Sequence, residues 1–129
     1  MSKYKFTAEY ELRASPKVLF PYVSTASGLS QWFASKVNTM PNHMYDFIWD
    51  GESHPARLST LRQNKIVKFD FTPTDEERDH PYLEFRLDVS DLTQSTFLKV
   101  TDCSTNGDSE ELKALWNGLL NNLREIVGS

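Results

Sequence analysis

The chain has 129 residues, about the length of one domain, so we expect a single hydrophobic core over residues 1–129. Its 3 Trp, 5 Tyr and 8 Phe exclude an intrinsically disordered chain, because so many aromatic side chains favour collapse into a packed core. The formal net charge of −4 argues against nucleic acid as a partner, since phosphate binding needs clustered Lys and Arg.

The first predicted element is a strand over residues 4–13, where apolar and polar side chains alternate. Ser15 and Pro16 then predict the start of a short helix, because the hydroxyl can cap the first turn and a proline loses no hydrogen bond there. Pro21 removes a backbone hydrogen bond one turn later. We therefore expect this helix to bend or to end near Ser24, with Val18, Leu19 and Tyr22 on its buried side.

A second short helix is predicted to follow, with Thr25 as its N-terminal cap. Its inward positions recur at spacings of three and four: Leu29, Trp32 and Phe33. From residue 35 to residue 103 the apolar period changes to two, and turn residues interrupt it at the intervals of a meander. We expect strands over residues 35–40, 44–49, 56–62, 66–72, 82–89 and 95–103.

Alternation gives the sheet one apolar face. The side chains predicted to point inward are Tyr4, Phe6, Ala8, Tyr10, Leu12, Tyr45, Phe47, Trp49, Ala56, Leu58, Val67, Phe69, Phe71, Leu83, Phe85, Leu87, Val89, Leu98 and Val100. Asp46 and Asp70 fall in the opposite phase, so we expect both to face outward. Residues 73–81 are rich in acids with almost nothing apolar, which predicts a solvated acidic loop.

The last predicted element is a long C-terminal helix. Asp108 and Glu111 have the spacing of a capping box, and Gly128 suits the end of the helix. Its apolar positions are predicted to form one stripe that faces the core: Leu112, Leu115, Trp116, Leu119, Leu120, Leu123, Ile126 and Val127. This order of elements predicts an α+β fold with helices on one face of an antiparallel sheet, and a wedge between them in which a pocket can form.

The sequence shows neither the spacing of a metal site nor a nucleophile paired with a base. His43, His54 and His80 lie in or beside predicted turns, and Cys103 is the single cysteine, expected to be an inert, partly buried thiol. The sequence has no glycine-rich phosphate loop and no nucleophile elbow. We therefore expect no metal, no cofactor and no catalytic residue, and a protein that is more naturally a binding module than an enzyme.

The chain shows no targeting or membrane signal. No segment approaches the roughly 20 apolar residues that cross a bilayer, and residues 1–12 carry polar side chains throughout, unlike a signal peptide. We expect a cytoplasmic protein without membrane insertion. The sequence leaves the oligomeric state open.

Several segments resemble a known family. Residues 14–20 (ASPKVLF) and 27–33 (SGLSQWF) are similar to the opening of the START-like superfamily, also called SRPBCC or Bet v 1-like. The resemblance continues through residues 47–51 (FIWDG), 95–102 (STFLKVTD) and 115–123 of the last helix. Within the superfamily, the chain most resembles small bacterial START-like proteins near the activator of heat-shock-protein-90 ATPase homologues.

The resemblance covers essentially the whole chain. It implies a helix-grip fold, in which a curved antiparallel sheet of about six to seven strands surrounds the long C-terminal helix and two short helices follow the first strand. Members of the superfamily bind lipids, hormones or polyketides, a few act as cyclases, and others are co-chaperone domains. The motifs are packing and turn signatures, so they indicate the fold and say little about the substrate.

Six aromatic side chains from different predicted elements project to the inner side: Tyr10, Trp32, Trp49, Phe69, Phe85 and Trp116. Two interpretations stay open. These side chains either form a solid core, or they line a ligand cavity in which the Tyr10 hydroxyl and the indole N–H groups are the polar handles.

Three functions follow from these interpretations. The first is a non-catalytic protein that encloses a small hydrophobic or amphipathic ligand in the cleft between the sheet and the last helix. The alternative is a protein-interaction domain of the chaperone-activator type with a filled core, and the third is a polyketide-cyclase-like enzyme. A cavity of several hundred cubic ångströms would favour ligand binding, and a filled interior would favour interaction.

Overall fold

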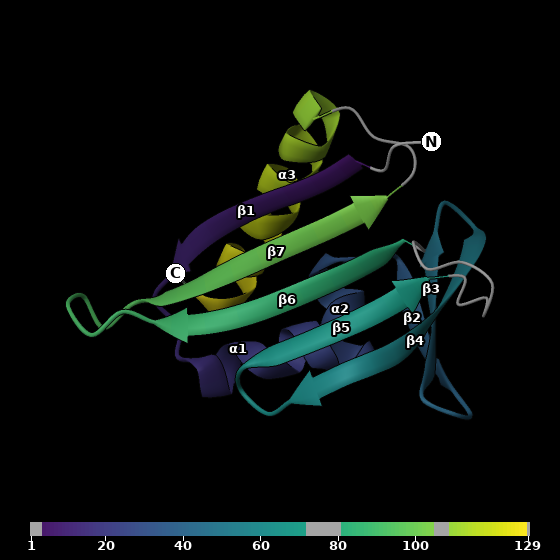
Figure 1. The fold of residues 1–129 in the computed structure, drawn as a ribbon, viewed down its shortest axis with the longest axis horizontal. Helices are drawn as coiled ribbons and strands as arrows, with labels where there is room; N and C mark the ends of the chain where they lie inside the picture. Colours follow the sequence, from purple (N-terminus) through teal and green to yellow (C-terminus); the bar gives the residue numbers. More distant parts are fainter. Residues whose placement is uncertain (1–3, 72–80, 105–108, 129) are drawn as a thin grey trace.

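The computed structural model describes residues 4–71, 81–104 and 109–128. In this part of the chain, seven strands and three helices follow one another in the predicted order. They are β1 (Tyr4–Leu12), α1 (Pro16–Ser24), α2 (Ala26–Trp32), β2 (Lys36–Met40), β3 (Met44–Trp49), β4 (Glu52–Arg62), β5 (Ile66–Phe71), β6 (Tyr82–Val89), β7 (Thr96–Ser104) and α3 (Ser109–Val127) (Figure 1). The predicted α+β class is confirmed.

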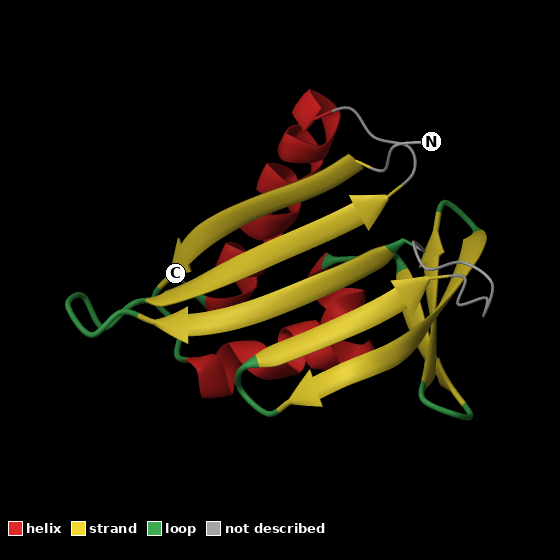
Figure 2. Ribbon diagram, in the orientation of Figure 1, coloured by secondary structure: helices red, strands yellow, loops and turns green. Residues whose placement is uncertain are grey.

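The strands form a single antiparallel sheet in the order β1-β7-β6-β5-β4-β3-β2. The first and last strands of the chain are therefore neighbours, with Tyr10 of β1 opposite Leu98 of β7. Figure 2 shows all three helices on the same side of the curved sheet, with α3 behind β1 and β7. The side chains between the sheet and the helices therefore form the core, and a site in this layer would have to be built from them.

Two side-chain caps set the start of the short helices. The Ser15 hydroxyl accepts a hydrogen bond from Val18 N at 3.3 Å, and the Thr25 hydroxyl accepts one from Gly28 N at 2.9 Å. Helix α1 contains Pro21 and ends at Ser24, as the sequence predicts. The two helices cross so closely that a Cβ atom on Gly28 would lie 2.1 Å from the carbonyl oxygen of Pro21.

Four apolar side chains that the periodicity predicts to be buried are instead exposed: Val18 by 50%, Val89 by 50%, Leu115 by 53% and Ile126 by 37%. Val18 lies on the outer side of the first turn of α1, while Leu19 next to it is buried. The eight apolar positions of α3 span an arc of about 140° at 3.6 residues per turn, and Leu115 and Ile126 lie at one edge of it. The opposite side of this arc is buried against the core, with Trp116, Leu120 and Leu123 each exposed by 1% or less. Val89 is the last residue of β6 and lines an open pocket at the end of the sheet.

The two strand acids keep their predicted outward phase, and both are half-buried. The Asp46 carboxylate accepts a hydrogen bond from the Ser53 hydroxyl, and the Asp70 carboxylate lies 3.9 Å from Lys68 Nζ. Two predictions fall outside the described residues: the acidic loop, apart from its last residue, and the capping contact of Asp108.

Candidate functional site

The six aromatic residues predicted to line a site lie on the inner side of the sheet and differ in burial. Trp32, Phe69, Phe85 and Trp116 expose 4% or less of their surface. Tyr10 and Trp49 are partly buried and pack against the same core. All six side chains therefore belong to the core or border it.

Three of the six touch one another directly. The ring centroids of Trp32 and Phe85 are 5.8 Å apart, those of Phe85 and Trp116 are 5.9 Å apart, and those of Trp32 and Trp116 are 6.4 Å apart. These separations are typical of aromatic pairs in van der Waals contact. The three rings come from α2, β6 and α3, so this triangle joins both layers of the fold.

Two further rings, Phe33 and Phe47, extend this contact to the rest of the set. Phe33 stacks on Trp116 at 5.5 Å and meets Trp49 edge-on at 5.1 Å. Phe47 stacks on Trp49 at 5.6 Å and meets Phe69 edge-on at 5.3 Å. The structure therefore brings five of the six predicted residues into one aromatic network. Both linking residues are predicted to point inward, but the sequence gives no sign that they join the others.

The polar groups of this network are hydrogen-bonded within the protein. Nε1 of Trp32 donates to the Tyr22 carbonyl oxygen at 2.8 Å, and Nε1 of Trp49 donates to the Phe33 carbonyl oxygen at 2.9 Å. Nε1 of Trp116 donates to Asp102 Oδ2 at 3.0 Å. All three indole donors that could orient a ligand are thus already occupied.

Tyr10 is the sixth predicted residue, and it differs from the other five. Within the described ranges its ring makes no aromatic contact, and its hydroxyl is buried without a hydrogen-bond partner. Burial raises the pKa of this hydroxyl above its ordinary value, and the nearby positive charge of Arg124 partly opposes that effect. The phenol therefore stays neutral at physiological pH.

Asp102 is a site residue that the residue-by-residue interpretation missed. It follows Leu98 and Val100 in the inward phase of β7, and it lies opposite Phe6 and Leu83 in the neighbouring strands. Burial raises the pKa of its carboxyl group, while the hydrogen bond from Trp116 lowers it by a smaller amount. This carboxylate is engaged in holding an indole rather than facing open space.

Within residues 4–71, 81–104 and 109–128, no three His, Cys, Asp or Glu side chains come together as metal ligands would. Cys103 is buried as a free thiol. No helix in the described ranges is long and apolar enough to cross a membrane.

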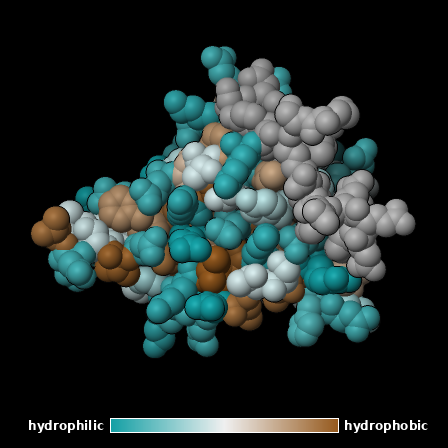
Figure 3. Space-filling view, in the orientation of Figure 1, coloured by the Kyte–Doolittle hydropathy of each residue, from teal (hydrophilic) through white to brown (hydrophobic). Residues whose placement is uncertain are grey.

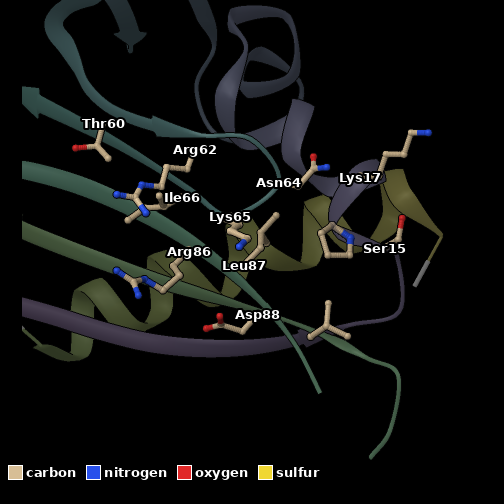
Figure 4. Close-up of a pocket in the computed structure, with 12 residues that line it drawn as sticks. Ser15, Lys17, Thr60, Arg62, Asn64, Lys65, Ile66, Arg86, Leu87 and Asp88 are labelled. Carbon is tan, nitrogen blue, oxygen red and sulfur yellow. The ribbon is translucent and has the colours of Figure 1, made fainter. Parts of the chain in front are cut away.

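An open pocket of about 840 Å³ lies elsewhere, where α1 begins beside the turn between β4 and β5 (Figure 4). None of the six predicted aromatic residues lines it. Four basic side chains surround it, together with one acid, Asp88: they are Lys17, Arg62, Lys65 and Arg86. The sequence did not indicate this pocket, because its residues come from separate elements that only the fold brings together.

Comparison with known proteins gives consistent results. The family model of the START-like superfamily domain matches residues 1–129. Among solved structures, the Aha1 dimer of Colwellia psychrerythraea is 17% identical, with a TM-score of 0.72 over 95% of this chain and 94% of that chain. A protein of Mesorhizobium loti is 14% identical, with a TM-score of 0.77 over 97% of each chain. A Bacteroides fragilis protein is 30% identical, with a TM-score of 0.64 over 98% of this chain and 93% of that chain.

No curated protein sequence matches the chain. The family match nevertheless spans every residue, and the sheet order, the two short helices and the long final helix agree with the helix-grip fold that the resemblance implied. The expected likeness to the activator homologues is confirmed at the level of the fold, because an Aha1 structure is among the similar folds. The chain therefore belongs to the START-like superfamily.

Proposed function

We propose that this domain is a protein-interaction module of the chaperone-activator type, and that its aromatic interior is a structural core. The observation that supports the proposal most strongly is the hydrogen bonding of the three indole groups. Trp32, Trp49 and Trp116 all donate to acceptors of the protein itself. A ligand entering between the sheet and α3 would find no unoccupied indole donor.

Entry of a ligand would also cost packing energy. It would have to separate rings that are in contact, such as Phe33 and Trp116 at 5.5 Å. Any indole that lost its acceptor while still buried would cost about 1 to 3 kcal/mol. Both costs would be subtracted from the affinity of an apolar ligand, and a ligand without strong polar contacts gains little to offset them.

A similar fold supports an interaction role. The Colwellia psychrerythraea protein is an Aha1 that forms a dimer. At 17% identity the shared fold alone is certain, so we carry over only the type of function, which is contact with another polypeptide.

Native mass spectrometry of the protein purified gently from its own host tests this proposal. We expect a second polypeptide, either another protein or a second copy of this chain, to remain bound. We also expect no additional mass in the range of a lipid or polyketide. A stoichiometric small molecule without any bound polypeptide would contradict the proposal.

A second candidate is the binding of a small amphipathic ligand between β1 and α3, and Tyr10 is the residue that favours it. Its buried hydroxyl has no hydrogen-bond partner in the described part of the chain, and a buried hydroxyl normally finds one. A ligand oxygen at this position would accept the missing hydrogen bond, with the charge of Arg124 nearby. The five other predicted residues, Trp32, Trp49, Phe69, Phe85 and Trp116, would then form the apolar wall behind it.

Calorimetry with a long-chain fatty acid separates this candidate from the first. If the Tyr10 hydroxyl orients a ligand, the wild-type protein binds the fatty acid and Tyr10→Phe binds it about tenfold more weakly, since one hydrogen bond to a charged group is lost. Absence of binding to the wild-type protein would eliminate the candidate. Equal affinities would show that the hydroxyl takes no part.

A further inference from the structure

We infer that the open pocket at the start of α1 binds an acidic segment of a partner protein that also carries apolar side chains. This inference rests on the proposed interaction function and deepens it by naming the surface and the chemistry of the partner. The pocket has more basic than acidic side chains. Lys17, Arg62, Lys65 and Arg86 surround it in a chain whose formal net charge is −4.

The register of the sheet places part of this charge in a row. Ile66 of β5 lies directly opposite Arg62 of β4 on one side and Arg86 of β6 on the other. Arg86 in turn lies opposite Lys99 of β7. Glu9 of β1 lies opposite Lys99 on its other side and offsets that charge, whereas the register places no acid between Arg62 and Arg86. An anion over Ile66 would therefore lie between two arginines.

The four cations are available to a ligand. All four are exposed, and within the described residues none of them forms an ion pair. Asp88, the acid at the pocket, is also exposed and is not within ion-pair distance of them. Arginine side chains bind carboxylates through two parallel hydrogen bonds, which makes a carboxylate a suitable partner for Arg62 and Arg86.

Apolar surface lies at the same end of the molecule. Half-buried Ile66 lines the pocket together with Val89, which is 50% exposed, whereas Leu87 of the same lining is buried in the core. Val18, one residue beyond the pocket-lining Lys17, is 50% exposed, and Leu92 in the turn between β6 and β7 is 96% exposed. In Figure 3, brown atoms appear at the tip of the molecule where Figure 1 places this turn. A partner with carboxylates alone would leave these apolar side chains exposed to water, so we expect the partner to carry apolar side chains as well.

The shape of the pocket favours a peptide segment over other anions. A concave volume of about 840 Å³ matches the size that encloses a ligand of a few residues, whereas a membrane is flat and meets protruding surfaces. Nucleic acid is disfavoured by the acidic chain as a whole. An extended segment with alternating acidic and apolar side chains fits both the cations and the apolar lining.

Fluorescence anisotropy with a short labelled peptide of alternating Glu and Leu tests the inference. We expect saturable binding that weakens as salt is raised, and no binding of the matching peptide of Lys and Leu. Arg62→Glu combined with Arg86→Glu should weaken binding by about a hundredfold, because two charge-assisted contacts become repulsive. A control with the same change of charge, Lys36→Glu combined with Lys113→Glu, alters exposed residues outside the pocket and should bind as the wild type does.

We expect both double variants to fold, because all four substituted residues are exposed, and thermal unfolding checks this. Equal binding by the two double variants would overturn the inference, as would absence of saturable binding to the Glu and Leu peptide. Binding to vesicles of phosphatidylserine without binding to the peptide would identify a membrane surface instead. Self-association that the pocket reversal abolishes, without peptide binding, would identify a second copy of the chain.

The failure of this inference can be distinguished from the failure of the proposed function. A polypeptide that co-purifies with the wild type and equally with the pocket reversal would preserve the interaction function and reject this surface. Absence of any co-purifying polypeptide would reject the function itself.

Discussion

Partial burial of Asp102 has two opposite effects on stability. The carboxylate accepts the hydrogen bond of the Trp116 indole at 3.0 Å, yet its own burial penalises the charged form. We predict that Asp102→Asn matches or exceeds the wild type in free energy of unfolding at neutral pH, because the amide oxygen still accepts the bond without a buried charge. Asp102→Ala leaves the indole without its acceptor and should lose about 1 to 3 kcal/mol. Denaturant titration measures the free energy of unfolding of both variants. Equal losses in Asp102→Asn and Asp102→Ala would contradict the role of Asp102 as the acceptor.

The same carboxyl group predicts a dependence on pH. Its pKa in the folded state is raised above the ordinary value of 3.8, so between these two values the folded state keeps a proton that the unfolded state has lost. The wild type should therefore lose stability relative to Asp102→Asn as pH rises through this window, and the difference should be constant below and above it. Free energies of unfolding of both proteins between about pH 3 and pH 7 measure this difference. A difference that does not change with pH, or that changes in the opposite direction, would show that burial does not shift this group.

The sequence predicts the positions of such residues better than their partners. Alternation that places Leu98 and Val100 inward continues to Asp102, so its inward phase could have been predicted. The acceptors of Trp32 and Trp49 are backbone carbonyl oxygens of Tyr22 and Phe33, and no periodicity indicates which carbonyl a side chain reaches. That information exists only once the chain has folded.

At the scale of elements, the contact between α1 and α2 depends on one glycine. A Cβ atom at residue 28 would lie 2.1 Å from the Pro21 carbonyl oxygen and 2.6 Å from Tyr22 Cα, and backbone cannot move aside as a side chain can. Gly28→Ala should therefore destabilise the protein by about 1 to 3 kcal/mol or more. Gly118→Ala in α3 is the matched control: nothing lies within 4 Å of its added Cβ, and alanine favours helix by up to about 1 kcal/mol. Thermal unfolding should give opposite shifts, and a stable Gly28→Ala would contradict the close crossing.

In helix α3, a buried side chain and an exposed side chain are neighbours. Trp116 is 1% exposed and Leu115 beside it is 53% exposed. Trp116→Ala should cost about 3 to 5 kcal/mol, while Leu115→Ala should change stability by no more than about 0.5 kcal/mol. Denaturant unfolding of the two variants checks the rotation of α3 about its axis. Similar losses of stability in both variants would show that this rotation is wrong.

Periodicity predicts the elements well and their burial less well. The strand and helix periods, the two caps and Pro21 were enough to place nearly every element, because these features are local to the chain. The width of the buried stripe on α3 was overestimated, since hydrophobic character alone does not say how wide a surface the sheet offers. Leu115 and Ile126 lie beyond that width.

For the molecule as a whole, we propose different roles for the interior and the surface. The predicted ligand-lining residues form a joined aromatic network with occupied donors, with Tyr10 set apart from it. The basic pocket at the start of α1 depends on the register of three strands and the placement of a helix, so no segment of the sequence could reveal it. A shared fold therefore does not require a shared ligand cavity.

The most direct measurement of whether the interior is filled is NMR of the three indole N–H groups in ¹⁵N-labelled protein, during titration with a long-chain fatty acid and then with a flat aromatic compound. Trp32, Trp49 and Trp116 report on the centre of the network and on its half-buried edge. Because all three donors are already bonded within the protein, we expect their signals to stay in place up to millimolar ligand. Saturable displacement of the Trp32 and Trp116 signals by either compound would show a cavity between the sheet and α3, and would contradict a structural role for the aromatic interior.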